Sequence, residues 1–211
     1  MLVDWTECGK VLSGRALDKG ESVSVFLIDE QTERLWETDR LQKFTPAPDR
    51  LGQWSWPIDF CLYINRTSDV IQAGSWKDGK WVVEGSSFSN RLWRTAQNIR
   101  AFTNCPGADN WVRAEPIHPT VSLKAGDVVE VMVRSEISGR RYRAERFRPL
   151  KDRLQPAQWA QDLAAWINKT FDMIRAGCPD ASGQRIKETA DKAGNYIWVP
   201  HNSKLTVSWE V

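Results

Sequence analysis

Two stretches of the chain alternate apolar and polar residues with the period of a β-strand. They run from Leu17 to Leu27 and from Leu123 to Val133, and a glycine followed by an acidic residue, Gly20-Glu21 or Gly126-Asp127, marks a turn in each. Successive side chains of a strand point to opposite faces. The pattern therefore predicts strands that are buried on one face and exposed on the other.

A tight hairpin is predicted around Asp78-Gly79. An Asp-Gly pair favours a two-residue type I′ turn, because both central residues of that turn need a positive φ. The flanking residues are tryptophans, and the register of such a hairpin places Trp76 directly opposite Trp81. Residues 135–142 predict a second hairpin with Glu136 facing Arg141. Residues 196–211 predict two strands around a turn at residues 200–203.

The chain contains an internal duplication. Three blocks recur in the same order, and the offset changes only between blocks, where loops gain or lose residues. The blocks are residues 4–30 with 110–136, 46–74 with 149–177, and 92–93 with 197–198. We therefore expect an all-β fold of two tandem β-sandwich domains, residues 1–107 and 108–211.

The middle segment of the two copies gives conflicting patterns. In the second copy, apolar residues recur at helical spacing over residues 159–174, and Gly177 would end the helix. In the first copy, residues 58–64 alternate as a strand does. Copies of one domain should share a structure, so only one pattern can hold. We expect strands ending near Asn65 and Asn168, with short helical segments confined to loops.

Composition narrows the class of protein. The 211 residues include 29 basic and 27 acidic side chains, and 41% are hydrophobic, which is typical of a packed domain. A net charge of +2 gives no general attraction to nucleic acid, so we expect no specific nucleic-acid partner. No apolar run could span a membrane, and the first residues lack the pattern of a signal peptide. We expect a cytoplasmic protein, or one released without a conventional signal peptide.

Enzymatic chemistry finds little support in the sequence. The four cysteines are far apart and form no C-x-x-C pair, and only two histidines occur. Neither a nucleophile elbow nor a phosphate-binding loop is present. The basic run between Arg140 and Arg153 is the main charge cluster. It fits a charged edge strand or a site for an anionic partner.

Tryptophan is unusually frequent, with 12 residues against 3 tyrosines and 7 phenylalanines. An indole can stack on the C–H face of a sugar ring while its N–H donates a hydrogen bond. Tryptophans matched between the copies favour core positions, namely Trp5/Trp111, Trp56/Trp159 and Trp93/Trp198. Unmatched ones favour exposure, namely Trp36, Trp54, Trp76, Trp81 and Trp209.

Two acidic residues join the tryptophans as candidate sugar contacts. Asp49-Arg50 and Asp152-Arg153 recur in the proline-containing loops of the two copies. Each Asp-Arg pair fits either an ion pair within its domain or recognition of a polyhydroxylated ligand. The predicted sugar-binding residues are Asp49, Trp54, Trp56, Trp76, Trp81 and Asp152.

The order of motifs resembles that of the bacterial galactophilic lectins of the PA-IL type and the wider galactose-binding-like β-sandwich group. The shared elements are a Trp, then Leu-x-x-Gly-acid-x-Val-x-Val, a Pro-rich loop, and a closing Val-Pro-x-Asn-x-x-Leu-x-Val strand pair. The resemblance implies a jelly-roll sandwich that binds galactose through calcium. The implied calcium ligands are Asn104, Asp109 and Asn110 in the first copy. Cys105 stands where the family has an acid, and the second copy reaches Val211 before such a loop.

The sequence thus favours a noncatalytic, lectin-like protein with a carbohydrate partner, preferably a galactoside, and calcium in the first copy alone. Two linked copies would allow bivalent attachment, and a homo-oligomer is compatible with this function. The alternative is a protein- or membrane-interaction module of toxin or immunity type, which would use exposed Trp and Arg surfaces.

Overall fold

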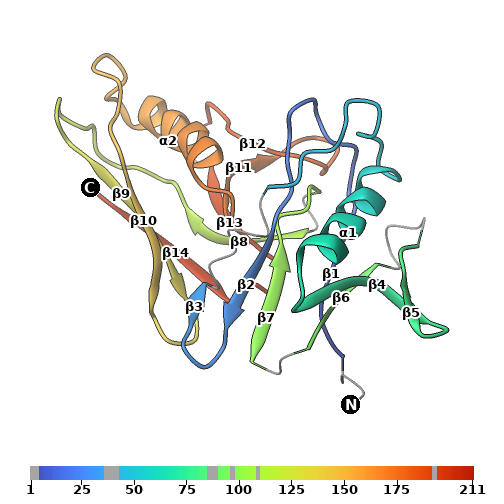
Figure 1. Cartoon of the computed structure of the whole chain (residues 1–211). Helices are drawn as coiled ribbons and strands as arrows, with labels where there is room; N and C mark the ends of the chain where they lie inside the picture. The colour runs from blue at the N-terminus through green and yellow to red at the C-terminus, as the bar shows by residue number, and fades with distance from the viewer. Residues whose placement is uncertain (1–4, 36–42, 85–89, 96–97, 108–109, 192–193) are drawn as a thin grey trace. The chain divides into compact units, whose positions relative to one another are not determined.

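The computed structural model describes residues 5–35, 43–84, 90–95, 98–107, 110–191 and 194–211. The chain divides into two compact units, Met1–Asn110 and Trp111–Val211, whereas the sequence placed the division after Gly107. Within these described residues, each unit contains two sheets and one helix (Figure 1). The fold is mostly β, as the alternating pattern predicted. Neither helix in the described part of the chain is long and apolar enough to cross a membrane.

Unit 1 combines a four-stranded sheet, order β1-β6-β4-β5, with a three-stranded sheet, order β3-β2-β7. Its elements are β1 (Thr6–Lys10), β2 (Val25–Asp29), β3 (Arg34–Leu35), α1 (Trp56–Thr67), β4 (Ile71–Lys77), β5 (Lys80–Val82), β6 (Arg91–Arg94) and β7 (Ile99–Thr103). The core contains one face of α1, with Trp56, Phe60 and Ile64 fully buried among apolar residues of both sheets. Burial of these side chains holds the helix and the sheets together.

Unit 2 repeats this arrangement, with a four-stranded sheet, order β12-β11-β13-β8, and a three-stranded sheet, order β10-β9-β14. Its elements are β8 (Trp111–Pro116), β9 (Val129–Ser135), β10 (Arg141–Phe147), α2 (Pro156–Thr170), β11 (Arg175–Pro179), β12 (Ile186–Lys187), β13 (Tyr196–Pro200) and β14 (Leu205–Glu210). Strand for strand, the two orders correspond, so the duplication seen in the sequence is a duplication of one fold.

The same buried polar groups hold each copy together. The indole N–H of Trp56 donates to the Arg15 carbonyl at 3.0 Å, and that of Trp159 donates to the Val121 carbonyl at 3.1 Å. Trp93 and Trp198 likewise donate to glycine carbonyls of the neighbouring strand, Gly74 and Gly177. Buried donors need partners, so these bonds fix the position of each indole.

Asparagines supply the second set of repeated links. The Asn65 side chain exchanges two hydrogen bonds with the backbone of Ala73, and Asn168 does the same with Ala176. Asn90 and Asn195, which are almost completely buried, bind the backbones of Glu84 and Thr189 in the same two-bond manner. Each asparagine ties two chain segments together without secondary structure. Asn65 and Asn168 therefore have structural roles, although each is the first residue of an Asn-x-Thr triplet, the sequence pattern of a glycosylation acceptor.

The strand predicted over residues 58–64 is wrong. This segment is helical in both copies, and α1 and α2 each have a proline in the first turn, which lacks an N–H that the helix would leave unpaired. In α1 the buried side chains follow helical spacing, Trp56, Phe60 and Ile64, while Leu62 is exposed. An alternation of apolar and polar residues over so short a segment is compatible with a strand and with a helix. Only packing against the sheets selects the helix.

The predicted hairpins have mixed outcomes. Trp76 does lie opposite Trp81, and Asp78 and Gly79 have the positive φ angles of the expected turn. The pairing of Glu136 with Arg141 is wrong, because β9 ends at Ser135 and Arg141 lies opposite Arg134. Residues 196–211 do form two strands around the predicted turn. However, β13 and β14 belong to different sheets, so the turn crosses from one layer to the other.

Candidate functional site

The outward face of the sheet β1-β6-β4-β5 carries an aromatic cluster. Leu92 in β6 is fully buried, so the next residue, Trp93, points to the opposite face. Trp93 lies between Glu7 of β1 and Gln72 of β4, and Trp76 and Trp81 follow on β4 and β5. Period-two alternation across four strands thus places these residues on one face of the sheet.

Four indoles form what we call the tryptophan face: Trp5, Trp76, Trp81 and Trp93. Trp81 is central, with its ring centroid 5.1 Å from that of Trp5, 5.2 Å from that of Trp76 and 5.8 Å from that of Trp93. Edge and tilted contacts of this kind stabilise the rings against one another. Trp76 at the outer end remains 54% exposed. The cluster therefore presents an apolar surface to solvent.

Polar side chains border this surface. Arg91, two residues before Trp93 in β6, pairs with Glu7 of β1. Gln72 donates a hydrogen bond to the Ser68 carbonyl at 3.1 Å. An aromatic surface with a polar border suits a ligand that has both C–H and hydroxyl groups, because the rings take the C–H face and the border takes the hydroxyls.

The equivalent face of unit 2 is covered by arginines. Arg113, the counterpart of Glu7, lies with its guanidinium carbon 4.0 Å from the Tyr196 ring centroid and 5.3 Å from that of Trp198. Arg175, the counterpart of Gln72, lies 5.6 Å from the Trp111 ring centroid. Trp111 and Trp198 are each only 7% exposed. In place of the Trp76/Trp81 pair, unit 2 has Pro179 opposite Ile186.

The predicted sugar contacts divide into three groups. Trp76 and Trp81 lie on the tryptophan face. Trp54 is exposed to the same degree as Trp76, 54%, but lies in the loop before α1 and makes no ring contact with the tryptophan face within the described residues. Trp56 is completely buried and its indole N–H is already bonded, so its ring offers no surface to a ligand.

The two predicted aspartates are exposed, and their arginine neighbours act within the fold. Arg50 binds Asp59 of α1 through two hydrogen bonds of 2.8 Å, and Arg153 pairs with Asp162 of α2 at 3.1 Å. Asp49 and Asp152 are simply solvent-facing loop residues. Each arginine therefore forms an ion pair within its own unit, as one of the two interpretations predicted. Its partner is an aspartate of the helix and not the aspartate that precedes it in the sequence.

The proposed calcium ligands have other neighbours in the structure. The Asn104 carboxamide oxygen accepts the Ser24 backbone N–H at 2.6 Å, and the Asn110 side chain donates to the carbonyls of Leu12 and Pro106. Asp109 lies outside the described residues. Within those residues, no group of three or more His, Cys, Asp or Glu side chains is placed to hold a metal ion. Calcium stays a prediction from the resemblance alone.

Burial makes the thiols of unit 1 poor nucleophiles. It raises the pKa of Cys8 to about 12 and that of Cys105 to about 11, and it raises the pKa of Cys61 as well. A thiol reacts as its thiolate, and these remain protonated at neutral pH. Covalent chemistry at these three cysteines is therefore not supported.

Sequence reasoning missed two members of the tryptophan face. Trp5 and Trp93 recur in unit 2, and recurrence was taken as a sign of core packing. Only Trp56/Trp159 among the matched pairs lies at the centre of the core. The alternation of Leu92 with Trp93 and Arg91 could have placed Trp93 outward, because a strand cannot bury neighbouring residues on one face.

Comparison with protein families gives a match in two places. Residues 5–103 and again 111–210 match the family described as N-acetylglucosamine binding protein domain 2. The chain belongs to this family. The two matches confirm the tandem copies, and they support a carbohydrate-binding β-sandwich type without supporting the PA-IL type or galactose specificity. A comparison with curated proteins gave no match.

Proposed function

We propose that this tandem protein of the N-acetylglucosamine binding protein domain 2 family is a noncatalytic glycan-binding protein that uses the tryptophan face of unit 1. The observation that carries the proposal is the exposed ring of Trp76, braced edge-on by Trp81, which itself contacts Trp5 and Trp93. A sugar ring stacks on such a surface without the site having to reorganise.

The ligand class comes from the family description together with the chemistry of the face. N-acetylglucosamine has an acetamido methyl group and axial C–H bonds, which pack against indole rings, and hydroxyls for the polar border. Gln72 and the Glu7–Arg91 pair offer donors and acceptors beside Trp93. We favour glycans that contain N-acetylglucosamine, and a galactoside with calcium is the competing assignment.

Titration of the full chain followed by NMR tests this proposal. Each indole N–H gives its own ¹H–¹⁵N signal, so the experiment identifies which tryptophans meet the ligand. With N-acetylglucosamine oligomers, we expect shifts of the Trp76 and Trp81 signals, and at least a tenfold loss of affinity in Trp76→Ala, about 1.4 kcal/mol. Methyl galactoside, with and without calcium, forms the second arm.

The matched control is Trp54→Ala. Trp54 has the same exposed fraction as Trp76 but lies elsewhere in unit 1, so its removal deletes an equal amount of exposed aromatic surface. Affinity should be unchanged. If Trp54→Ala abolishes binding while Trp76→Ala does not, the tryptophan face is not the site. If no glycan moves any indole signal, the lectin-like function is wrong.

A further inference from the structure

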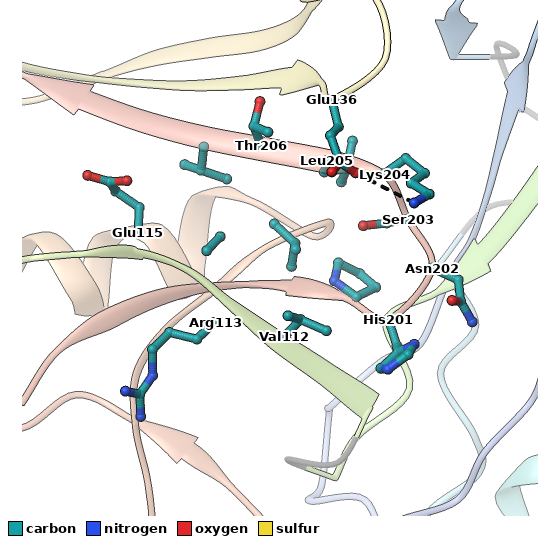
Figure 2. A pocket seen from close by; sticks show the side chains of 14 residues that line it. Val112, Arg113, Glu115, Glu136, His201, Asn202, Ser203, Lys204, Leu205 and Thr206 are labelled. Carbon is teal, nitrogen blue, oxygen red and sulfur yellow. Dashed lines mark ion pairs between the residues drawn. The ribbon is translucent and has the colours of Figure 1, made fainter.

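Unit 2 contains a hollow between its strands. It has a volume of about 440 Å³ and lies between β8 and the strands β13 and β14 (Figure 2). This volume falls within the range of pockets for small molecules, about 300–1,000 Å³. Its apolar wall consists of Val112, Ala114, Val199, Pro200, Leu205 and Val207.

Two polar side chains in this hollow have no partner among the described residues. The Ser203 hydroxyl is buried, with the residue only 1% exposed, and it makes no hydrogen bond. Figure 2 shows it pointing into the hollow. Glu115 also lines the hollow, and no hydrogen bond or ion pair is formed by its carboxylate. A buried polar group without a partner is costly, and an ordered water or a bound ligand would satisfy the Ser203 hydroxyl.

Two contacts join the elements around the hollow. The Trp209 indole donates to the Pro116 carbonyl at 2.8 Å and joins β14 to β8, beyond the residues that line the hollow. In the turn from β13 to β14, Lys204 pairs with Glu136 at 3.9 Å, and both residues line the hollow. The volume of the hollow suits a compact ligand such as one sugar ring.

The corresponding place in unit 1 is filled. Arg94 stands where unit 2 has Val199, and its guanidinium pairs with Glu30 at 3.4 Å and donates to the Ile99 carbonyl. The strands also approach more closely there. A Cβ atom at Gly9 would lie 3.1 Å from the Ala101 carbonyl oxygen, and unit 2 has Glu115 at that position. The two units thus differ at two positions beside the hollow, Arg94 to Val199 and Gly9 to Glu115.

We infer that the hollow of unit 2 is a second glycan site, which binds one neutral sugar ring, as a monosaccharide or at a chain end. The apolar wall takes the C–H face of the ring. The Glu115 carboxylate accepts hydrogen bonds from the sugar hydroxyls. The buried Ser203 hydroxyl forms a further hydrogen bond with the sugar. The lining contains the basic residues Arg113 and Lys204 beside the acidic residues Glu115 and Glu136, so its charges nearly balance and favour a neutral ligand over a charged one. The inference rests on the proposed function only for its choice of ligand class.

The test is a titration of the full chain with methyl N-acetylglucosaminide and methyl galactoside, followed through backbone amide signals. Binding in the hollow shifts the signals of Val112 and Thr206, whereas binding in unit 1 shifts those of Trp76 and Trp81. Val199→Arg copies the filling side chain of unit 1 and should weaken the hollow signals' response at least tenfold. Val121→Arg, at a 56% exposed valine of the same unit, is the matched control and should change nothing.

Ser203→Ala is a second variant, which tests the inference even if Val199→Arg does not fold. It removes a buried hydroxyl without a partner, so the melting temperature should stay equal or rise while sugar affinity at the hollow falls several-fold. Shifts confined to the tryptophan face would overturn this inference and leave the proposed function standing. Shifts confined to the hollow would support it and overturn the assignment to unit 1. The absence of shifts at both places would overturn both.

Discussion

The two copies share a frame and differ on their surfaces. The outward face of the four-stranded sheet in unit 1 has Glu7 and Gln72 beside Trp93, and its indoles reach solvent. In unit 2, arginines at the same two positions lie over Tyr196, Trp198 and Trp111. A cation over a ring face is held by the ring quadrupole, so it occupies the surface that a sugar would need. The two arginines cover the matched tryptophans of unit 2, which also has Pro179 and Ile186 in place of Trp76 and Trp81.

The space between the two sheets of each unit shows the opposite difference between the copies. There unit 1 is filled by Arg94, and unit 2 is open beside Val199. The duplication has thus kept the buried indole and asparagine links in both units, while each unit opens a different surface. Links that satisfy buried backbone groups leave little freedom to change, whereas an exposed strand position can exchange glutamate for arginine at small cost in stability.

The largest expected effect comes from breaking the shared frame. Trp56→Ala and Trp159→Ala each remove a fully buried indole that also bonds to a backbone carbonyl. Each should destabilise its own unit by about 3–5 kcal/mol. Hydrogen exchange with mass spectrometry on the full chain resolves the two units. Equal loss of protection in both units from either variant would contradict two independent cores.

A smaller loss is expected from Asn90→Ala and Asn195→Ala. Each variant leaves a backbone N–H and a carbonyl without their side-chain partner, in a site that water does not reach easily. The cost should be about 1–3 kcal/mol and similar in the two units. Denaturant unfolding with unit-resolved exchange measures it. A cost in one unit only would show that the frame is not equivalent.

The surface difference can be transferred between the copies. Glu7→Arg together with Gln72→Arg gives unit 1 the two arginines of unit 2, so Trp5 and Trp93 should become covered. Glycan affinity at the tryptophan face should fall about tenfold, roughly 1.4 kcal/mol, with the fold unchanged. Calorimetry with N-acetylglucosamine oligomers measures this change. Glu7→Gln is the control, because it removes the charge without supplying a cation, and unchanged affinity in the double-arginine variant would refute the covering argument.

The smallest expected difference concerns the arginine–helix pairs. Burial raises the pKa of Asp162, with Arg153 acting in the opposite direction, and the Oδ2 atom of Asp162 has no partner. A carboxyl with a raised folded-state pKa costs stability while ionised, and this cost disappears as the pH falls below the unfolded value of 3.8. Asp162→Asn should therefore be neutral or stabilising at pH 7 and have less effect near pH 3.

Asp59→Asn provides the comparison for this pair. It removes a two-bond link to Arg50 that is partly exposed, so the loss should be below about 1 kcal/mol. Denaturant unfolding at both pH values tests the two variants together. A destabilising Asp162→Asn at pH 7, equal to Asp59→Asn, would show that the two pairs contribute alike.

The sequence alone determined that the chain is mostly β, that one fold occurs twice and that Trp76 lies opposite Trp81. Offsets between repeated blocks and an Asp-Gly turn are local features, and they survive in any packing. The helices were misjudged because residues 58–64 are too short to separate the two periods. Contact of Trp56, Phe60 and Ile64 with both sheets is what selects the helix.

Only the tertiary structure decided where ligands could meet the chain. Trp93 and Trp198 are matched in sequence, and their different exposure depends on which residue lies on the neighbouring strand, glutamate or arginine. The hollow beside Ser203 depends on side chains of β13 and β14 together with those of β8, a strand about 80 residues earlier in the chain. The sequence determines the shared fold, because its turns are local features and its buried hydrogen bonds recur in both copies. Surfaces are made by neighbours across strands, and their identity appears only when the sheets have formed.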